Sequence, residues 1–322
     1  MTKVKIYKMK KIWVPGSNGM VAKSLILKLK EKKLKFISTN RKQLDITNYK
    51  KVDNFLKKNK FDTIIMSAAK VGGIYANDNY SADFIRENLL IQLNTIELAR
   101  IHKIKKVIFL GSSCIYPKNS KQPILEDYLL NGKLEKTNES YAIAKIAGIK
   151  MVQAYRKQYN CDFISLMPTN LYGENDNFHL YNSHVVPALI KKIYYAKKRN
   201  KKSVSLWGTG YPKRDLLYVG DLVDAIILLA GKYSSSEPVN IGSDREITIS
   251  NLAKMIAKIF KYNGKIIFDP KFPNGTMRKV LNIKKIRKYG WRPKVSLERG
   301  LELTIKWFLK NEKKIQYSNN KF

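Results

Sequence analysis

Tyr141 and Lys145, in the segment YAIAK, are residue types that together could move a proton to or from a carbonyl oxygen. They are four residues apart on a helix predicted over residues 140–159, so their side chains lie on one face. A free phenol has a pKa of about 10, and a lysine ammonium about 4 Å away would favour the phenolate by up to roughly 4 kcal/mol. Ser112, which follows a strand predicted over residues 107–110, offers a hydroxyl to the same oxygen. This set predicts protonation of a ketone oxygen as a hydride reaches its carbon.

Cys114, in GSSCIYP, and His184, in NSH, are a second pair of groups that exchange protons near neutral pH. Unperturbed thiols and imidazoles have pKa values of about 8.5 and about 6.5, which suits a general base and a general acid. Beside the tyrosine and lysine, they suggest an enzyme that both moves hydrides and inverts carbon centres. From the residues alone, Cys114 could equally be a small buried residue after a strand, and His184 could begin a helix without any catalytic role.

The other histidines and the second cysteine have weaker claims to a catalytic role. His102 ends a predicted helix and is expected to be structural, whereas His179 in DNFH could support the loop that carries His184. Cys161 precedes a predicted strand and is expected to pack there. Two cysteines give no metal-ligand spacing, so no metal site is expected.

The segment IWVPGSNGMVAKS predicts a strand, a tight turn and the start of a helix. Gly16 and Gly19 would let the backbone approach a pyrophosphate, and the helix that follows would offer free N–H groups. Ala22 is small enough to keep the helix close to the strand. Alone the pattern is weak, because a turn and a helix without a ligand would read the same way.

The end of the second predicted strand bears on the choice of cofactor. An Asp or Glu there would accept from the ribose hydroxyls of NAD, but the stretch ISTNRKQLD holds Arg41 and Lys42 and no acid before Asp45. Cations at this place favour the 2′-phosphate of NADP(H). The alternative is two solvated charges in a lysine-rich chain.

Short apolar runs alternate with amphipathic stretches in the first half, which predicts an α/β fold with a doubly wound parallel (Rossmann) sheet. Ligands of such sheets sit beyond the carboxyl ends of the strands. The predicted strands are 11–14, 35–38, 63–66, 107–110 and 163–167, and the predicted helices are 20–30, 49–58, 81–101 and 140–159.

The second half is less regular. A helix is predicted over 185–198 and a strand ending near residue 207, while helix 219–229 and strand 239–241 are expected to rejoin the sheet. We therefore expect a cofactor-binding domain at 1–172, to which 217–245 returns, and a smaller mixed α/β substrate-binding domain at 173–216 and 246–322.

The composition bears on partners and location. The formal net charge is +37, but lysines are dispersed along the chain rather than gathered into one stripe, so solvated surface is expected rather than nucleic-acid binding. No stretch approaches the roughly 18 apolar residues of a membrane span, and the start MTKVKIYKMKKIWVPG has no apolar signal region. The expected location is the cytosol, where two unpaired cysteines stay reduced.

Longer runs of sequence carry a family resemblance that covers nearly the whole chain. They are AAKVGGIYAN, ADFIRENL, FLGSSCIYPK, ESYAIAKIAGIK, MPTNLYG, DNFH, NSHVVPAL, WGTGYPKRDLLYV and NGTMRK. With them the chain resembles the extended short-chain dehydrogenase/reductases of nucleotide-sugar metabolism, most closely the GDP-L-fucose synthase group. The resemblance implies Ser112, Tyr141 and Lys145 as the reductase triad, Cys114 as epimerase base and His184 as epimerase acid.

The implied reaction is the two-step conversion of GDP-4-dehydro-6-deoxy-D-mannose to GDP-L-fucose with NADPH. Carbons 3 and 5 are epimerised through enolates of the carbon-4 ketone, and hydride then reduces that ketone. The residues implied to bind the cofactor are Gly16, Ser17, Asn18, Gly19, Met20, Val21, Ala22, Arg41, Asp45, Ala68, Ala69, Leu110, Gly111, Ser112, Ser113, Lys145, Pro168, Thr169, Asn170, Leu171 and His184.

The resemblance also implies a GDP-sugar site and a homodimer formed by helices 81–101 and 140–159. Departures from the family pattern are Asn18 and Lys192, where Arg is usual, and Asn274, where Asp is usual; Lys279 is a further phosphate candidate. The nearest alternative is a sibling enzyme acting on another GDP-4-keto sugar, a deoxyheptose or a dideoxyhexose. The residues implied to bind the substrate are Asn170, Lys192, Trp207, Arg214, Asn274 and Arg278.

Overall fold

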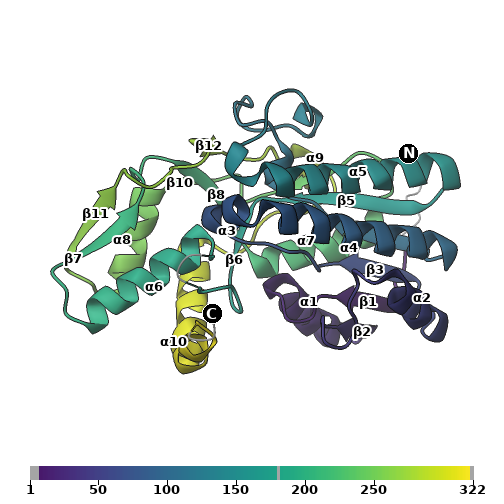
Figure 1. Ribbon diagram of the computed structural model, residues 1–322, viewed down its shortest axis with the longest axis horizontal. Coiled ribbons are helices and arrows are strands. Elements are labelled where there is room, and N and C mark those ends of the chain that lie inside the picture. Colours follow the sequence, from purple (N-terminus) through teal and green to yellow (C-terminus); the bar gives the residue numbers. More distant parts are fainter. Residues whose placement is uncertain (1–6, 180–181, 320–322) are drawn as a thin grey trace.

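A six-stranded parallel sheet forms the centre of the computed structural model, which describes residues 7–179 and 182–319 (Figure 1). Apart from the half-exposed edge strand at residues 35–39, its strands are short runs buried on both faces, as parallel strands covered by helices must be. The α/β fold class with a doubly wound sheet is thereby confirmed. In spatial order the strands are β2 (Lys35–Thr39), β1 (Lys11–Pro15), β3 (Thr63–Met66), β4 (Lys106–Leu110), β5 (Asp162–Pro168) and β9 (Val239–Ile241).

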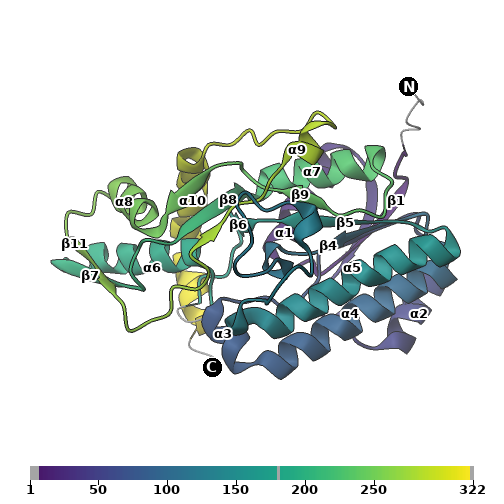
Figure 2. The ribbon, with the colours of Figure 1, turned by 90° about the horizontal axis from the view of Figure 1, so that it is seen from above.

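Helices cover both faces of this sheet (Figure 2). Side chains alternate across β1, so that Trp13 packs into one core while Ile12 and Val14 pack into the other. Each fully buried aliphatic side chain contributes about 1.5–3 kcal/mol. The core with Trp13 lies under α2 (Tyr49–Lys58), α4 (Ser81–Ile101) and α5 (Glu139–Tyr159), and the other lies under α1 (Met20–Glu31) and α7 (Val219–Lys232).

The strand order places a switch point between β1 and β3, because the chain leaves β1 towards β2 and then crosses back to β3. A crevice opens at such a point beyond the carboxyl ends of the strands. Gly16 follows β1 and Ala68 follows β3, and the two backbones nearly touch: a Cβ on Gly16 would lie 2.8 Å from the Ala68 Cα.

A smaller mixed unit covers the carboxyl end of the sheet, at the left of Figure 1. Its core includes Tyr172, Phe178, Ile190, Leu252 and Phe308. Its strands are β6 (Asn170–Tyr172), β8 (Lys213–Tyr218), β10 (Glu246–Thr248) and β12 (Arg278–Lys279) in one sheet, and β7 (Ser203–Trp207) and β11 (Lys265–Asp269) in another. Its helices are α6 (Val185–Lys198), α8 (Ile249–Phe260) and α10 (Leu297–Asn319), with α9 (Lys284–Arg287) beside the main sheet.

The predicted strands and helices of the first half are present within two residues of their expected ends, and helix 185–198 is found as α6. As expected, β9 rejoins the main sheet beside β5. The sequence did not indicate α3 (Ile74–Asn79) or the pairing of β6 with β8, through which residues 170–172 leave the main sheet. Within the described part of the chain, no helix is long and apolar enough to cross a membrane.

Candidate active site

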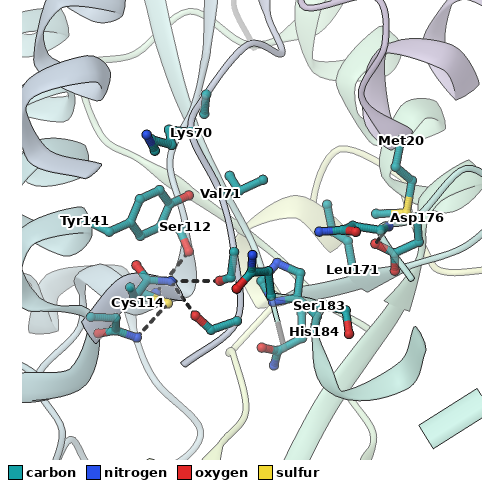
Figure 3. A pocket seen from close by; sticks show the side chains of 18 of the residues that line it. Met20, Lys70, Val71, Ser112, Cys114, Tyr141, Leu171, Asp176, Ser183 and His184 are labelled. Atoms are coloured by element: carbon teal, nitrogen blue, oxygen red, sulfur yellow. Dashed lines mark hydrogen bonds between the residues drawn. The ribbon is translucent and has the colours of Figure 1, made fainter. Parts of the chain in front are cut away.

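A cavity of about 910 Å³ lies where β1, β3, β4 and β5 end, between the main sheet and the smaller unit. All five residues expected to be catalytic line it: Ser112, Cys114, Tyr141, Lys145 and His184. Figure 3 shows Tyr141, Ser112 and Cys114 grouped together, with His184 across the pocket from them. Most of the expected binding residues also line it, and the three that do not are Ser17, Ala22 and Arg278.

The turn between β1 and α1 has the form that a pyrophosphate requires. Gly16 has a φ of +86°, which a residue with a Cβ rarely adopts, and this brings the turn against Ala68. Gly19 is the N-cap of α1 and no side chain caps the helix, so its first N–H groups are free for an anion. Ala22 is fully buried against the sheet and is a packing residue rather than part of the wall. The turn therefore fits a dinucleotide cofactor.

Arg41 and Asp45 line the same end of the cavity, near the end of β2. The largely exposed Arg41 guanidinium forms an ion pair of 2.9 Å with Glu87, and Glu87 also pairs with Lys70 at 2.8 Å. The Asp45 carboxylate accepts hydrogen bonds from the Thr47 hydroxyl at 2.7 Å and the Thr47 N–H at 3.1 Å. Arg41 is thus held by a carboxylate at the cavity wall, and neither Glu87 nor Lys70 was expected there from the sequence.

The Lys145 ammonium is buried and anchored to the main chain. Its Nζ donates to the Leu110 carbonyl at 2.8 Å, where β4 ends, and lies 5.8 Å from the centre of the Tyr141 ring. Burial lowers the pKa of Lys145 to about 8. The same burial, together with the nearby Cys114, raises the pKa of Tyr141 far above its ordinary range, although a hydrogen bond with Ser112 acts in the opposite direction.

The expectation that Lys145 lowers the pKa of Tyr141 is therefore wrong for this structure. Burial disfavours the phenolate more than the hydrogen bond with Ser112 favours it, so the phenol stays protonated. A protonated phenol beside the Ser112 hydroxyl is suited to donate to an oxygen that gains negative charge in the cavity.

Two donors reach the sulfur of Cys114. The Asn138 side-chain amide, at the start of α5, lies 3.4 Å from Sγ, and the Lys279 ammonium, on β12, lies 3.6 Å from it. The backbone N–H of Cys114 donates to the Ser112 hydroxyl at 3.2 Å, which orients the Ser112 side chain. Nothing in the local sequence indicated Asn138, because its contact depends on how α5 packs against the turn after β4.

His184 is the N-cap of α6 and its side chain is open to the cavity. The protein around the cavity desolvates the ring and, with the positive charge of Lys279, lowers the pKa of His184. The segment before it is held at two points: Asn182 donates its N–H to His179 Nδ1 at 3.3 Å, and the Gly73 N–H donates to the Asn182 carbonyl at 3.0 Å. His179 therefore contacts the loop that carries His184.

His102 and Cys161 lie elsewhere. His102 Nε2 is 2.8 Å from the Asp53 carboxylate. Neither His102 nor Cys161 lines the cavity. The sulfur of Cys161 packs at the edge of the core that contains Trp13.

Polar and aromatic side chains line the end of the cavity under the smaller unit. Lys192 Nζ lies 4.8 Å from the Trp207 ring centre. The Arg214 guanidinium donates to the Lys213 carbonyl at 2.9 Å and the Asn274 carbonyl at 3.2 Å. The Asn274 side-chain oxygen accepts from the Thr209 N–H at 2.8 Å, which orients this loop. Burial lowers the pKa of Lys192 and of Arg214.

The expectation that Arg278 contacts the substrate disagrees with its position. Successive side chains of a strand point to opposite faces, and on β12 it is Lys279 that reaches the cavity. Arg278 instead donates to the Glu246 carboxylate at 2.7 Å.

Asp176 is a cavity residue that the sequence did not single out. Its Oδ1 accepts from the Asn177 N–H at 2.7 Å, while its buried Oδ2 has no hydrogen-bond partner among the described residues. Burial raises the pKa of this carboxyl from its ordinary value of 3.8 to about 7. Figure 3 places it near Met20 and Leu171, away from Tyr141. Residues 7–179 and 182–319 hold no group of three or more His, Cys, Asp or Glu that could bind a metal ion.

Comparison with known proteins gives consistent matches over almost the whole chain. The model of the NAD dependent epimerase/dehydratase family matches residues 12–242. A GDP-L-fucose synthase from Sinorhizobium fredii (strain NBRC 101917 / NGR234) is 50% identical, with 94% of this chain and 96% of the relative covered. A GDP-L-colitose synthase from Yersinia pseudotuberculosis is 38% identical, with 94% and 99% covered.

A solved structure agrees with these matches. A GDP-L-fucose synthetase from Naegleria fowleri, bound to NADP, has a TM-score of 0.87 and 25% identity, with 96% of this chain and 97% of that chain covered. The family model spans well over half of the sequence, and it includes the glycine turn, the tyrosine and lysine, and the cysteine and histidine that meet in the cavity. The chain belongs to the NAD dependent epimerase/dehydratase family.

Proposed function

We propose that the chain is an NADPH-dependent epimerase/reductase that converts GDP-4-dehydro-6-deoxy-D-mannose to GDP-L-fucose. The observation that carries this proposal is that one cavity holds a reductase set, Ser112, Tyr141 and Lys145, together with a thiol and an imidazole, Cys114 and His184. A reductase needs only the first set. Two extra groups that exchange protons are what inversion of a carbon centre requires.

The carbon-4 ketone of the sugar acidifies the C–H bonds at carbons 3 and 5. The Cys114 thiolate takes the proton, the C–H bond breaks, and its electron pair moves to the ketone oxygen as an enolate. Ser112 and Tyr141, which lie together in the pocket (Figure 3), donate hydrogen bonds to that oxygen. His184, across the pocket, returns a proton to the opposite face of the carbon, and the centre is inverted.

Reduction uses the same oxygen site. NADPH, when bound, supplies the hydride. Tyr141 gives its proton to the oxygen, for which a phenol with a raised pKa is well prepared. The Lys145 ammonium, held by the Leu110 carbonyl, then stabilises the phenolate that remains. The residues that would hold the cofactor are the turn from Gly16 to Val21 and the stretch from Pro168 to Leu171, with Arg41 at the 2′-phosphate, and all but Ser17 line the cavity.

The GDP-sugar occupies the end of the cavity under the smaller unit. Arg214 is suited to two hydrogen bonds with a pyrophosphate and Lys192 to a single charged contact. Trp207 presents an aromatic ring, which already stacks on Phe272 with ring centres 4.5 Å apart. Asn274 holds the adjoining loop through Thr209.

A sibling enzyme for another GDP-4-keto sugar, a deoxyheptose or a dideoxyhexose, would use the same five catalytic residues. The relative named for GDP-L-fucose is 50% identical, against 38% for the one named for GDP-L-colitose. This difference supports the 6-deoxymannose substrate.

The test is incubation of the purified chain with GDP-4-dehydro-6-deoxy-D-mannose and NADPH or NADH, with product stereochemistry determined by NMR. The expected product is GDP-L-fucose, formed faster with NADPH. A product reduced at carbon 4 with carbons 3 and 5 unchanged would reduce the proposal to a simple ketone reductase. No turnover of this sugar, with turnover of a GDP-heptose or GDP-dideoxyhexose ketone, would favour the sibling activity.

We also infer a homodimer and a cytosolic location. The outer surface of α4 and α5 exposes apolar side chains, with Leu93 50% and Ile143 43% exposed, a pattern typical of an interface. Both cysteines are free thiols, and a thiol that acts as a base must stay reduced, which suits the cytosol.

A further inference from the structure

Lys279 is a charged residue of the cavity that the proposed reaction has not yet used. It lies on β12, and its Nζ is 3.6 Å from the sulfur of Cys114. No ion pair joins it to a carboxylate in the part of the chain that the structure describes, whereas its neighbour Arg278 pairs with Glu246. A half-buried ammonium without a counter-ion is stabilised when the group beside it becomes an anion. The nearest group that can do so is the Cys114 thiol.

Two other charged groups near the Cys114 sulfur, Arg214 and Glu135, already have partners of their own. Arg214, on β8, also interacts electrostatically with Cys114, but its guanidinium donates to two backbone carbonyls. Glu135, before α5, is paired with Lys118 at 3.0 Å. Tyr141 stays protonated because of burial and of Cys114 itself.

The same ammonium acts on His184. Its charge is the second cause, after burial, of the lowered pKa of that imidazole. One lysine therefore lies within electrostatic reach of both groups assigned to epimerisation. Its ammonium adjoins the sulfur of Cys114, and its charge disfavours the charged form of His184.

We propose that Lys279 is a positioning residue that couples the two proton transfers of epimerisation, because its ammonium lies 3.6 Å from the Cys114 sulfur and lines the same cavity as the His184 imidazole. This inference rests on the proposed function.

The coupling follows from charge balance. Before reaction the thiolate offsets the charge of Lys279, so the imidazolium at His184 is tolerated. When Cys114 takes the proton from carbon 3 or 5, the thiolate charge moves to the ketone oxygen of the substrate, and Lys279 loses its neighbouring anion. The uncompensated ammonium then repels the imidazolium proton, which passes to the opposite face of the same carbon. Total proton number is conserved, and exchange with solvent restores the pair.

A competing role for Lys279 is a simple contact with the pyrophosphate of the GDP-sugar. That role predicts weaker GDP binding and a raised KM in a Lys279 variant, with the substrate-free properties of Cys114 and His184 unchanged. The coupling role predicts the reverse, and it can be measured without substrate.

The first experiment measures alkylation of Cys114 by iodoacetamide as a function of pH in a Cys161→Ser background. With Lys279→Met we expect the rate at pH 7.5 to fall by about tenfold or more, because only the thiolate reacts. Lys279→Arg keeps the charge and is expected to restore most of the rate. Arg278→Met removes a charge from the adjacent residue, whose side chain lies outside the cavity, and is expected to leave the rate unchanged.

The second experiment follows the imidazole signals by NMR, which is practical because the chain has three histidines. The His184 titration midpoint is expected to rise in Lys279→Met and to be restored in Lys279→Arg, while His102, held by Asp53, serves as an internal reference. With the sugar present, Lys279→Met should lower the kcat for deuterium exchange at carbons 3 and 5 and leave KM nearly unchanged.

Unchanged alkylation and an unchanged His184 midpoint in Lys279→Met would overturn the proposal. Loss of GDP affinity alone would assign the lysine to phosphate binding. Both substrate-free readouts stand even if the sugar proves not to be the substrate, so failure of the proposed function is distinguishable from failure of this inference.

Discussion

Tyr141 and Cys114 occupy one pocket, and a negative charge on Cys114 disfavours a second one on Tyr141. Cys114 raises the pKa of Tyr141 in addition to burial, so a thiolate at one site keeps the phenol protonated at the other. The arrangement suits a base that acts first and an acid that acts later at the same sugar. The charge of the enolate oxygen is met by a neutral donor rather than by a second anion.

Tyr141→Phe removes that donor while the ring keeps its place against Phe84. Reduction is expected to fall by about a hundredfold or more, which is the typical contribution of a positioned general acid, and exchange at carbons 3 and 5 is expected to fall as well. NADPH consumption and deuterium incorporation measure the two steps. Tyr155→Phe, on the same helix with its hydroxyl on Glu97, is the matched control. Turnover at the unmodified rate would contradict the assignment.

Cys114→Ser separates the two reactions, because the thiol is assigned to proton removal alone. A serine hydroxyl is a much weaker base at neutral pH, so we expect deuterium incorporation at carbons 3 and 5 to fall by about a hundredfold or more before hydride transfer is lost. Residual NADPH consumption should then yield a sugar reduced at carbon 4 with unchanged neighbouring centres, visible by NMR. Cys161→Ser is the control and should behave as the unmodified protein. Unchanged deuterium exchange in Cys114→Ser would show that Cys114 is not the base.

The residue types of the site were predictable because each lies in a short, recognisable segment. Their electrostatic environment was not. The anchoring of Lys145 on the Leu110 carbonyl, and the contact of Lys279 with Cys114, depend on how distant strands and helices pack. The direction of the Tyr141 pKa shift was predicted wrongly for the same reason, since spacing along a helix gives proximity to Lys145 but does not give the degree of burial.

At the scale of elements, the position of His184 depends on a contact between two segments more than a hundred residues apart. The Gly73 N–H donates to the Asn182 carbonyl at 3.0 Å. A Cβ on Gly73 would lie 2.4 Å from the Ser183 carbonyl oxygen, and that atom belongs to the main chain and cannot turn away. The absence of a side chain at residue 73 thus sets how close α3 and the loop before α6 can come.

Gly73→Ala is expected to displace the loop and so to slow epimerisation by about tenfold or more, since a shift of about 1 Å can cost about a hundredfold in rate. Reduction should be less affected, because Tyr141 and Lys145 lie on α5. The measurements are deuterium exchange at carbons 3 and 5 and the NMR signal of His184, with the His102 signal as a reference that should not move. An unmoved His184 signal with normal exchange would show that the loop accommodates the methyl group.

The loop between β6 and α6 also contains a buried carboxyl whose effect on stability depends on pH. The folded-state pKa of Asp176, about 7, lies above its ordinary value of 3.8. Below about pH 4 the carboxyl is protonated in both the folded and the unfolded protein, so its burial costs little. Above about pH 7 the carboxyl is ionised in both the folded and the unfolded protein, and the full cost of burying the carboxylate applies. Asp176 therefore destabilises the protein increasingly between these values.

Asp176→Asn keeps an acceptor for the Asn177 N–H and removes the charge. We expect the variant to be more stable than the unmodified protein by more than about 1 kcal/mol at pH 8, where a raised pKa has its full effect, with the difference shrinking towards pH 5. Urea unfolding at several pH values measures this. Asp78→Asn, an exposed carboxyl on α3, controls for the change in net charge. Equal stabilities of variant and unmodified protein across the range would contradict the burial argument.

The longer elements were predictable because their apolar runs are buried whichever neighbour they have. Strand β4, for example, is buried at every residue. The short elements were not predictable: β6 and β12 have three and two residues, and they are strands only because each pairs with β8, which offers hydrogen bonds. The same reason explains why Arg278 was expected in the site, since the sequence did not indicate which face of β12 each side chain occupies.

At the scale of the whole molecule, charge and apolar surface act against each other. The formal net charge of +37 favours the arrival of a negatively charged GDP-sugar and repels a second copy of the chain. The proposed dimer must gain more from burying the apolar surface of α4 and α5 than this repulsion costs. Salt screens the repulsion, with a Debye length of about 10 Å at 0.1 M, and leaves the apolar contribution largely intact.

We therefore expect the dimer to tighten as salt is raised from 20 to 300 mM, and we expect Leu93→Lys to weaken it by about tenfold or more in Kd, since it places an additional charge in an apolar interface. Leu93 is 50% exposed on α4. Leu27→Lys is the matched control, because Leu27 is 65% exposed on α1, on the opposite face of the sheet. Sedimentation velocity over a range of protein concentrations measures both effects. A monomer at all concentrations and salt levels, or equal weakening of the dimer by the two substitutions, would contradict the proposal that α4 and α5 form the interface.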